Sequence, residues 1–271
     1  VERSRGLGDV YKRQIFMYEY LHRILGRIIG IIFFIPLLYF TIRKAIPPVL
    51  IPRLYLLLIL GGFQGVLGWY MVKSGLVDDP NVSQYRLTAH LGMAVFIYSL
   101  ILWTVFDLSL NYNHAIRSRI KWMSSTLTLL IFLMILSGGL VAGTRAGIPF
   151  PTWPLMGDTF IPPQIYSMNP SWLSAFEDMA TIQFNHRMFA YLLTIFIVIF
   201  AIVLLGSNVP RFLKNGTTVL LFVLSLQVVL GISTLLFYIP IPVAAAHQVG
   251  AIALLSVSLF ITHSCLSREQ I

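Results

Sequence analysis

Seven long apolar stretches limit what this chain of 271 residues can fold into. They lie at about 19–42, 54–73, 87–106, 123–143, 184–205, 216–238 and 243–263. Each is close to the roughly 20 residues that a helix needs to cross a bilayer. Lipid offers the backbone no hydrogen-bond partners, so spans of this length are helices. With only 11% charged residues, against about 25% in a soluble domain, the sequence predicts an all-α integral membrane protein.

The net charge of +9 lies in loops beside these spans, so it does not indicate nucleic-acid binding. Three alternate loops are basic and carry Arg43, Lys44, Arg53, Arg117, Arg119, Lys121, Arg211 and Lys214. Because cytoplasmic loops are enriched in Lys and Arg, we expect these loops to face the cytoplasm or the mitochondrial matrix. The single cysteine, Cys265, excludes an intramolecular disulfide and a cysteine-based metal site.

A pattern of polar residues and glycines within the spans occurs twice. The first copy reads Glu-Tyr-Leu-His-Arg at 19–23, Gln-Gly-Val-Leu-Gly at 64–68 and Ala-His at 89–90. The second reads Gln-Phe-Asn-His-Arg at 183–187, Gln-Val-Val-Leu-Gly at 227–231 and Ala-His at 246–247. Four histidines, His22, His90, His186 and His247, therefore occupy equivalent outer helix ends.

Imidazole is a common ligand of metals and haem iron. Two histidines on facing helices, in each of two repeats, are what bis-histidine haem sites in a membrane bundle require. We therefore expect the helices of each pair to be neighbours with their histidines facing inward. The other two histidines, His114 and His263, lie at inner loops or helix ends, where we expect solvated or interfacial side chains.

The two copies differ in charge at one position, where Glu19 in the first corresponds to Gln183 in the second. A carboxylate within a span is costly and indicates function, although Glu19 could also pair with a nearby arginine. The asymmetry suggests that one half performs proton chemistry and the other holds a cofactor. Arg23 and Arg187, which follow the histidines, either reach to the headgroups or bind haem propionates.

The first copy lacks an apolar segment equivalent to 123–143, which precedes the second copy. We infer that the natural protein has an eighth helix at its N-terminus and that residues 1–14 are unrelated to it. The alternative is a seven-span protein with an external basic tail. The expected organisation is thus a tail at 1–14, a three-helix N-terminal half at 15–110 and a four-helix C-terminal half at 111–271.

The outer loop at 144–180 is rich in proline and aromatic residues and is expected to cap a cavity or lie in the interface.

Several motifs together resemble the haem A synthase family, which converts haem O to haem A for cytochrome oxidase. They are the Glu-Tyr-Leu-His-Arg and Gln-Phe-Asn-His-Arg segments, Thr-Ala-His-Leu-Gly at 88–92, the glycine-rich run at 138–147, Thr-Trp-Pro-Leu-Met at 152–156 and Ala-His-Gln at 246–248. The likeness covers residues 18–255. The outer loop lacks the cysteine pairs of some bacterial members, so no redox role is carried over to it.

The resemblance implies eight helices in two pseudo-symmetric four-helix halves. It implies that His186 and His247 bind haem b as axial ligands, that His22 and His90 hold the substrate haem O, and that Glu19 is the catalytic carboxylate. The reaction it implies is oxidation of a ring methyl to a formyl group by successive hydroxylations and loss of water. The implied partners are membrane lipid, haem O synthase, an electron donor and the cytochrome oxidase assembly machinery.

The membrane implied is the bacterial plasma membrane, with the mitochondrial inner membrane as the alternative, and the histidine ends lie on the periplasmic or outer side.

Two other functions also fit the histidine pattern. One is a bis-histidine b-type cytochrome that exchanges electrons with quinone, which would not need a glutamate in one half alone. The other is a non-catalytic haem carrier or transporter, which is disfavoured because transporter ligands usually lie at helix breaks near the midplane.

Overall fold

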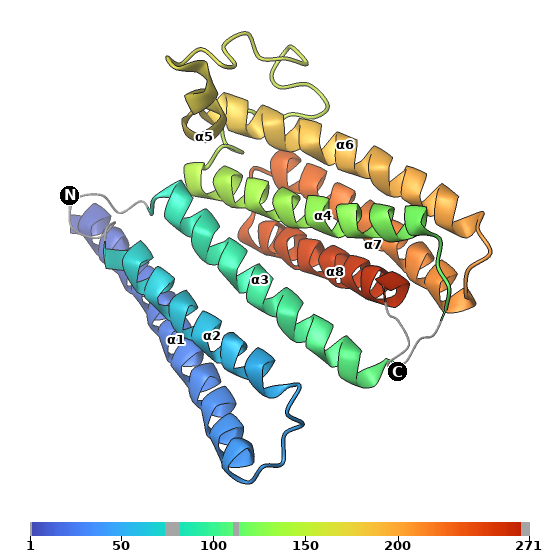
Figure 1. Ribbon diagram of the computed structural model, residues 1–271. Helices are drawn as coiled ribbons and strands as arrows, with labels where there is room; N and C mark the ends of the chain where they lie inside the picture. Colours follow the sequence, from blue (N-terminus) through green and yellow to red (C-terminus); the bar gives the residue numbers. More distant parts are fainter. Residues whose placement is uncertain (1, 74–81, 111–113, 267–271) are drawn as a thin grey trace. The chain divides into compact units, whose positions relative to one another are not determined.

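The computed structural model describes residues 2–73, 82–110 and 114–266 (Figure 1), without the side chains of residues 2–16 and 19. Its secondary structure in these ranges is helical, apart from one isolated bridge between Met156 and Thr159. The helices are α1 (Glu2–Ile42), α2 (Ile51–Lys73), α3 (Gln84–Ser109), α4 (Ser118–Thr144), the 3-10 turn η1 (Ser171–Leu173), α5 (Ser174–Glu177), α6 (Met179–Leu205), α7 (Arg211–Leu236) and α8 (Ile241–Leu266).

Seven of the described helices are long and apolar enough to cross a membrane: α1 from Tyr20 onward, α2, α3, α4, α6, α7 and α8. The prediction of an all-α integral membrane protein is confirmed. Most helices extend beyond their apolar stretch by a few polar residues. For example, α6 begins at Met179 because the carboxylate of Asp178 accepts hydrogen bonds from the Thr181 backbone N–H at 2.8 Å and hydroxyl at 2.6 Å, which is a favourable N-cap.

The chain divides into two compact units, residues 1–69 and 70–271, and each is described by itself. The first unit contains α1 and most of α2, and residues 2–14 continue the helix α1. The second unit contains α3 together with the C-terminal helices, since α3 packs against both α4 and α8. The assignment of 15–110 and 111–271 to two haem-binding halves, and the separate origin of 1–14, stay predictions.

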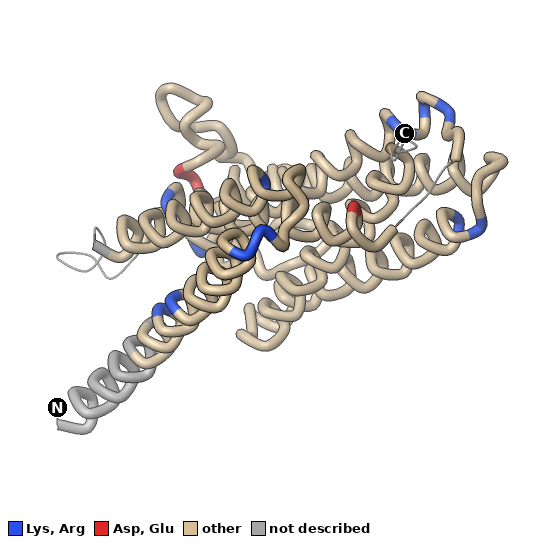
Figure 2. The backbone as a smooth tube through the Cα atoms, turned by 60° about the horizontal axis from the view of Figure 1, so that its bottom comes forward, with Lys and Arg blue, Asp and Glu red and all other residues tan. Residues whose placement is uncertain are grey.

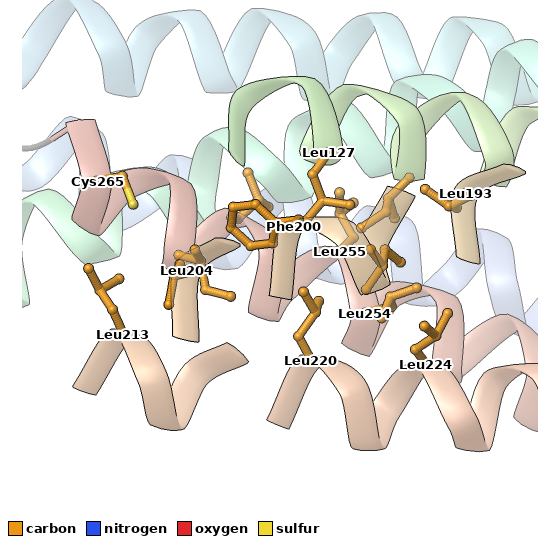
Figure 3. Packing of buried hydrophobic residues seen from close by; sticks show 14 of the residues in the cluster. Leu127, Leu193, Phe200, Leu204, Leu213, Leu220, Leu224, Leu254, Leu255 and Cys265 are labelled. Carbon is orange, nitrogen blue, oxygen red and sulfur yellow. The ribbon is translucent and has the colours of Figure 1, made fainter. Parts of the chain in front are cut away.

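Four helices of the second unit form a closed bundle. The helix α4 packs on α6 and α8, and α7 packs on the same two helices, so α6 and α8 occupy opposite corners. Leu127 of α4, Phe200 of α6, Leu220 of α7 and Leu255 of α8 are at most 1% exposed and meet along the bundle axis (Figure 3). Helix α3 approaches α4 so closely that a side chain at Gly143 would meet the Gln84 backbone at 2.7 Å, a contact that small residues permit.

The two ends of the second unit differ in the charges that begin their helices, and Figure 2 marks Lys and Arg positions in blue and Asp and Glu positions in red. Lysines and arginines begin α4 and α7, whereas acidic residues surround the beginning of α6. The histidines His90, His186 and His247 all lie within about the first two turns of α3, α6 and α8. These helices run in the same direction between the acidic and the basic end, so the three histidines share the end that carries the acids.

Candidate functional site

His186 and His247 lie on diagonally opposite helices of the four-helix bundle. They belong to α6 and α8, at opposite corners, and their rings contact α4 and α7, respectively. The expectation that their helices would be side by side is therefore wrong, because α4 and α7 lie between them. Both rings contact helices of the bundle, in agreement with the expectation that they point inward. Binding of one haem iron by the two histidines stays a prediction.

Each of these two imidazoles rests against a glycine of the neighbouring helix. A Cβ atom at Gly138 of α4 would lie 3.6 Å from Cε1 of His186, an ordinary contact. A Cβ atom at Gly231 of α7 would lie only 2.9 Å from Cε1 of His247, so the ring would have to move. The repeated Gln-x-x-x-Gly motif thus has a specific use at this site, since Gly231 makes room for the histidine ring.

The ring of His186 also has a hydrogen-bond partner that the sequence analysis missed. Its Nδ1 lies 3.0 Å from the hydroxyl oxygen of Ser137 on α4. The only sequence signal was the position of Ser137, directly before the glycine-rich run that begins at Gly138. The Nδ1 atom of His247, by contrast, is buried without a hydrogen-bond partner in the described part of the chain.

Unsatisfied polar atoms gather at this end of the second unit. Without partners among the described residues are Thr88 Oγ1, Gln183 Oε1, Arg187 Nε, Gln227 Oε1 and His247 Nδ1, all of them buried. Most buried polar atoms in proteins are hydrogen-bonded, so several orphans at one end of the unit indicate a missing polar ligand or water. The donors present fit a bis-histidine haem, since His186 and His247 can supply two nitrogen ligands, a porphyrin brings four of its own, and Arg187 Nε, buried without a partner among the described residues, can donate to a propionate.

Arg187, predicted as a propionate partner, anchors the outer loop in this structure. It is only 6% exposed, and its two terminal nitrogens donate to the carbonyl oxygens of Leu155 at 3.1 Å and Phe150 at 3.0 Å. The Gln183 side chain donates to the same Phe150 carbonyl at 3.0 Å. Propionate binding by Arg187 stays a prediction, and only its Nε remains without a partner among the described atoms.

This anchor gives a physical reason for glutamine at position 183. The amide nitrogen donates to a carbonyl, whereas an ionised carboxylate can only accept hydrogen bonds. A glutamate here would place two acceptors against each other inside the protein. The equivalent Glu19 lies in α1, but its side chain is outside the described residues, so its catalytic role stays a prediction.

Further contacts hold the outer loop on the helices below it. Trp153 donates through its indole N–H to the hydroxyl of Tyr191, at 3.1 Å, and the hydroxyl of Tyr166 donates to the side-chain oxygen of Asn185, at 3.0 Å. At the far end of the loop, the Glu177 carboxylate accepts hydrogen bonds from two side chains of α3, the Tyr85 hydroxyl at 2.6 Å and the Gln84 amide nitrogen at 2.8 Å. The loop is therefore fixed to both α6 and α3 at the histidine end.

The first-copy residues are distributed over the two units. His22 and Arg23 are exposed on α1 in the first unit, and His90 is half-buried on α3 in the second. The pairing of His22 with His90 around a substrate haem, and the role of Arg23 toward its propionates, stay predictions.

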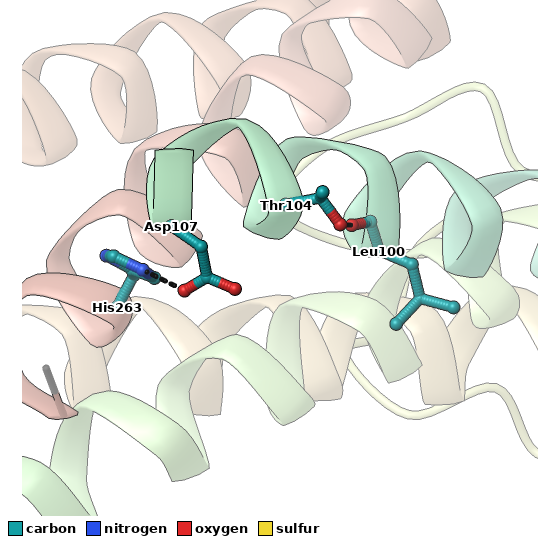
Figure 4. Close-up of polar contacts among 4 residues, drawn as sticks. All are labelled: Leu100, Thr104, Asp107 and His263. Atoms are coloured by element: carbon teal, nitrogen blue, oxygen red, sulfur yellow. Dashed lines mark hydrogen bonds and ion pairs between the residues drawn. The ribbon is translucent and has the colours of Figure 1, made fainter. Parts of the chain in front are cut away.

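His263 corrects one expectation. Instead of being solvated, it is 3% exposed, and its Nε2 lies 2.8 Å from Oδ1 of Asp107 on α3 (Figure 4). The rings of Trp103 and Phe106 pack on it with centroid distances of 5.0 and 5.6 Å. An aspartate and two aromatic rings from one neighbouring helix make burial of this imidazole possible. His114 is exposed, as expected.

Comparisons with known proteins show the family of the chain. The family model COX15-CtaA, described as cytochrome oxidase assembly protein, matches residues 8–259. The chain belongs to this family. The match begins inside the stretch 1–14 that the sequence analysis sets apart. It also includes every residue proposed above for the site.

Relatives in this family cover most of the chain. A heme A synthase of Nitrosospira multiformis is 46% identical over 261 residues, which are 93% of this chain and 72% of that protein. Heme A synthases of Parvibaculum lavamentivorans and Wolbachia pipientis wMel are 41% and 36% identical, over 96% and 95% of this chain and 74% and 72% of those proteins.

Proposed function

We propose that this protein is a haem A synthase, an enzyme that oxidises a ring methyl of haem O to a formyl group and so supplies haem A to cytochrome oxidase. The observation that carries the proposal is the pair His186 and His247, which lie at the same end of one helical bundle with their rings against its helices. Membership of the cytochrome oxidase assembly family and the relatives named heme A synthase support it.

In this proposal the C-terminal bundle holds a resident haem b through His186 and His247. When bound there, haem b supplies one-electron chemistry. The bundle contributes two neutral imidazoles and an apolar interior. The outer loop, tied down by Arg187 and Gln183, covers the end of α6 that carries His186.

In this proposal the N-terminal residues bind and oxidise the substrate. His22 and His90 hold the substrate haem O, and Arg23 pairs with its propionates. Glu19 accepts or donates protons while the methyl carbon is oxidised. Each of two successive hydroxylations inserts one oxygen atom of dioxygen into a C–H bond of the methyl group and reduces the other oxygen atom to water, with two electrons from the electron donor and two protons. The resulting geminal diol loses water to leave the formyl group.

The location and partners follow from the same proposal. The basic ends of α4 and α7 face the cytoplasm of a bacterium, by the excess of positive charge in inner loops, and the histidine end faces the periplasm. Haem O synthase delivers the substrate, and the cytochrome oxidase assembly machinery receives the product. A separate protein or quinone serves as the electron partner.

The test is conversion of haem O to haem A in membranes containing the protein, followed by extraction and identification of the haems. Glu19→Gln should reduce the rate by about 10²–10⁴ while haem b stays bound, because the variant lacks a titratable proton. Asp158→Asn, at an exposed loop acid, is the control and should convert normally. Full conversion by Glu19→Gln would remove the catalytic role, and a wild-type protein that binds haem b without making haem A would favour the b-type cytochrome.

A further inference from the structure

The two histidines at the C-terminal site are held in different ways. His186 has a hydrogen-bonding neighbour at Nδ1, the hydroxyl of Ser137 at 3.0 Å. His247 is held by the close approach of its ring to Gly231 and by the backbone of Gln227, and its Nδ1 has no partner of its own among the described residues. A single iron bound by both would thus have two unlike imidazole ligands.

The Ser137 contact decides which nitrogen of His186 is available. A neutral imidazole has one N–H donor and one acceptor nitrogen. If Nδ1 carries the hydrogen and donates it to the Ser137 oxygen, Nε2 keeps the lone pair that a metal needs. Histidine ligands of metals usually have their second nitrogen bound in this way, which fixes the tautomer and the ring orientation and raises the basicity of the ligand.

The hydroxyl of Ser137 is the hydrogen-bonding neighbour that restrains the His186 ring. Gly138, the next residue of α4, offers only an ordinary van der Waals contact to Cε1, at 3.6 Å. On the same helix, Ser125 and Thr144 bond to their own backbone, at 3.0 Å from the Lys121 carbonyl and 2.7 Å from the Leu140 carbonyl. Thr128 reaches hydroxyls of α8. Ser137 reaches a histidine on another helix.

We propose that Ser137 is a positioning residue, which orients His186 and fixes its tautomer for binding of haem iron through Nε2. The inference rests on the proposed haem b site and adds a residue that acts through His186. It predicts that the hydroxyl group at position 137, rather than the size of the side chain, controls the affinity of the site for haem.

The experiment compares Ser137→Thr with Ser137→Val, since threonine and valine have the same shape and differ in the hydroxyl. Ferric haem b is titrated into each detergent-purified protein, and the electron paramagnetic resonance spectrum of the bound haem is recorded. The threonine variant should bind like the wild type. The valine variant should bind about 10–100-fold more weakly, with an altered low-spin signal. Ser125→Ala is the control on the same helix and should change neither.

Equal affinities and spectra for the wild type and both variants would overturn the proposal. Equal losses in both variants would overturn it too, because they would show a steric effect of the added branch. Failure of the haem b site itself is distinguishable, since the wild type would then bind no haem and His186→Ala would change nothing. Thermal unfolding of the haem-free proteins shows whether each variant is folded.

Discussion

The two ends of the second unit differ in whether their buried polar groups have hydrogen-bond partners. At the basic end, Asp107 pairs with His263, and the Thr128 hydroxyl meets those of Ser258 and Thr262 at 2.7 and 2.8 Å. Thr262 also donates to the Ser124 carbonyl at 2.9 Å. Ser264 Oγ is the exception among the described residues there. At the histidine end, orphaned atoms from α3, α6, α7 and α8 lie in the same region.

The presence or absence of hydrogen-bond partners distinguishes a structural polar network from a binding site. A satisfied buried network stabilises and orders the helices that it joins, whereas an unsatisfied one is costly unless a ligand completes it. Among the described residues of the basic end, only Ser264 Oγ is buried without a partner. At the histidine end, the Arg187 N–H and the Thr88 hydroxyl can donate to haem propionates, whereas the amide oxygens of Gln183 and Gln227 need a donor such as water. Both ends contain a buried histidine, so the histidine alone does not mark the site.

The strongest way to break the comparison is to remove the histidines at each end. His186→Ala or His247→Ala should abolish stable binding of haem b, because an axial ligand is lost. His263→Ala should bind haem b with the wild-type spectrum, since this imidazole is already occupied by Asp107. Absorption spectra of the purified proteins measure the result. Loss of haem in all three variants, or in none, would contradict the distinction.

The contact of each imidazole with its glycine gives a finer comparison within the site. Gly231→Ala should lower haem affinity on the order of tenfold, the low end for residues that orient metal ligands, because the new methyl group displaces the His247 ring. Gly138→Ala should have little effect, since its methyl group would lie 3.6 Å from His186. Titration with haem b measures both. Similar affinities for the two variants would count against the steric role of Gly231.

At the basic end, substitution should affect stability and leave haem binding unchanged. Asp107→Leu leaves the buried His263 nitrogen without its partner and should destabilise the protein by about 1–3 kcal/mol. Asp107→Asn keeps a side-chain oxygen at this position and should lose less. Thermal unfolding in detergent gives the stability, and the spectrum of bound haem gives the second readout. A changed haem spectrum in Asp107→Leu would show that the two ends are coupled.

The smallest effect is expected at Arg187, where two roles can be told apart. Arg187→Lys should lose one of the two loop carbonyls, at a cost of about 1 kcal/mol, because an ammonium group lacks the planar fork of a guanidinium. The loop at 150–166 should then be cut faster by proteases, with haem affinity unchanged. A fall in haem affinity with the loop equally protected would instead support a propionate partner.

Local sequence predicted part of this arrangement well. The spans follow from the length of apolar stretches, and the inward direction of His186 and His247 follows from the repetition of their motifs. The contacts that explain the site could not be predicted, because they join residues far apart along the chain: Ser137 and His186 are 49 residues apart, and Asp107 and His263 are 156 apart. Arg187 was predicted to bind a ligand because its contacts with the Phe150 and Leu155 carbonyls of the outer loop also join residues far apart along the chain.

The most direct test of the haem site is electron paramagnetic resonance of the wild-type protein loaded with ferric haem b. We predict a low-spin signal typical of two imidazole ligands, which His263→Ala retains and which His186→Ala and His247→Ala lose. A high-spin signal from the wild type, or haem that washes away during purification, would contradict a bis-histidine site at the end of the bundle where the polar atoms lack partners.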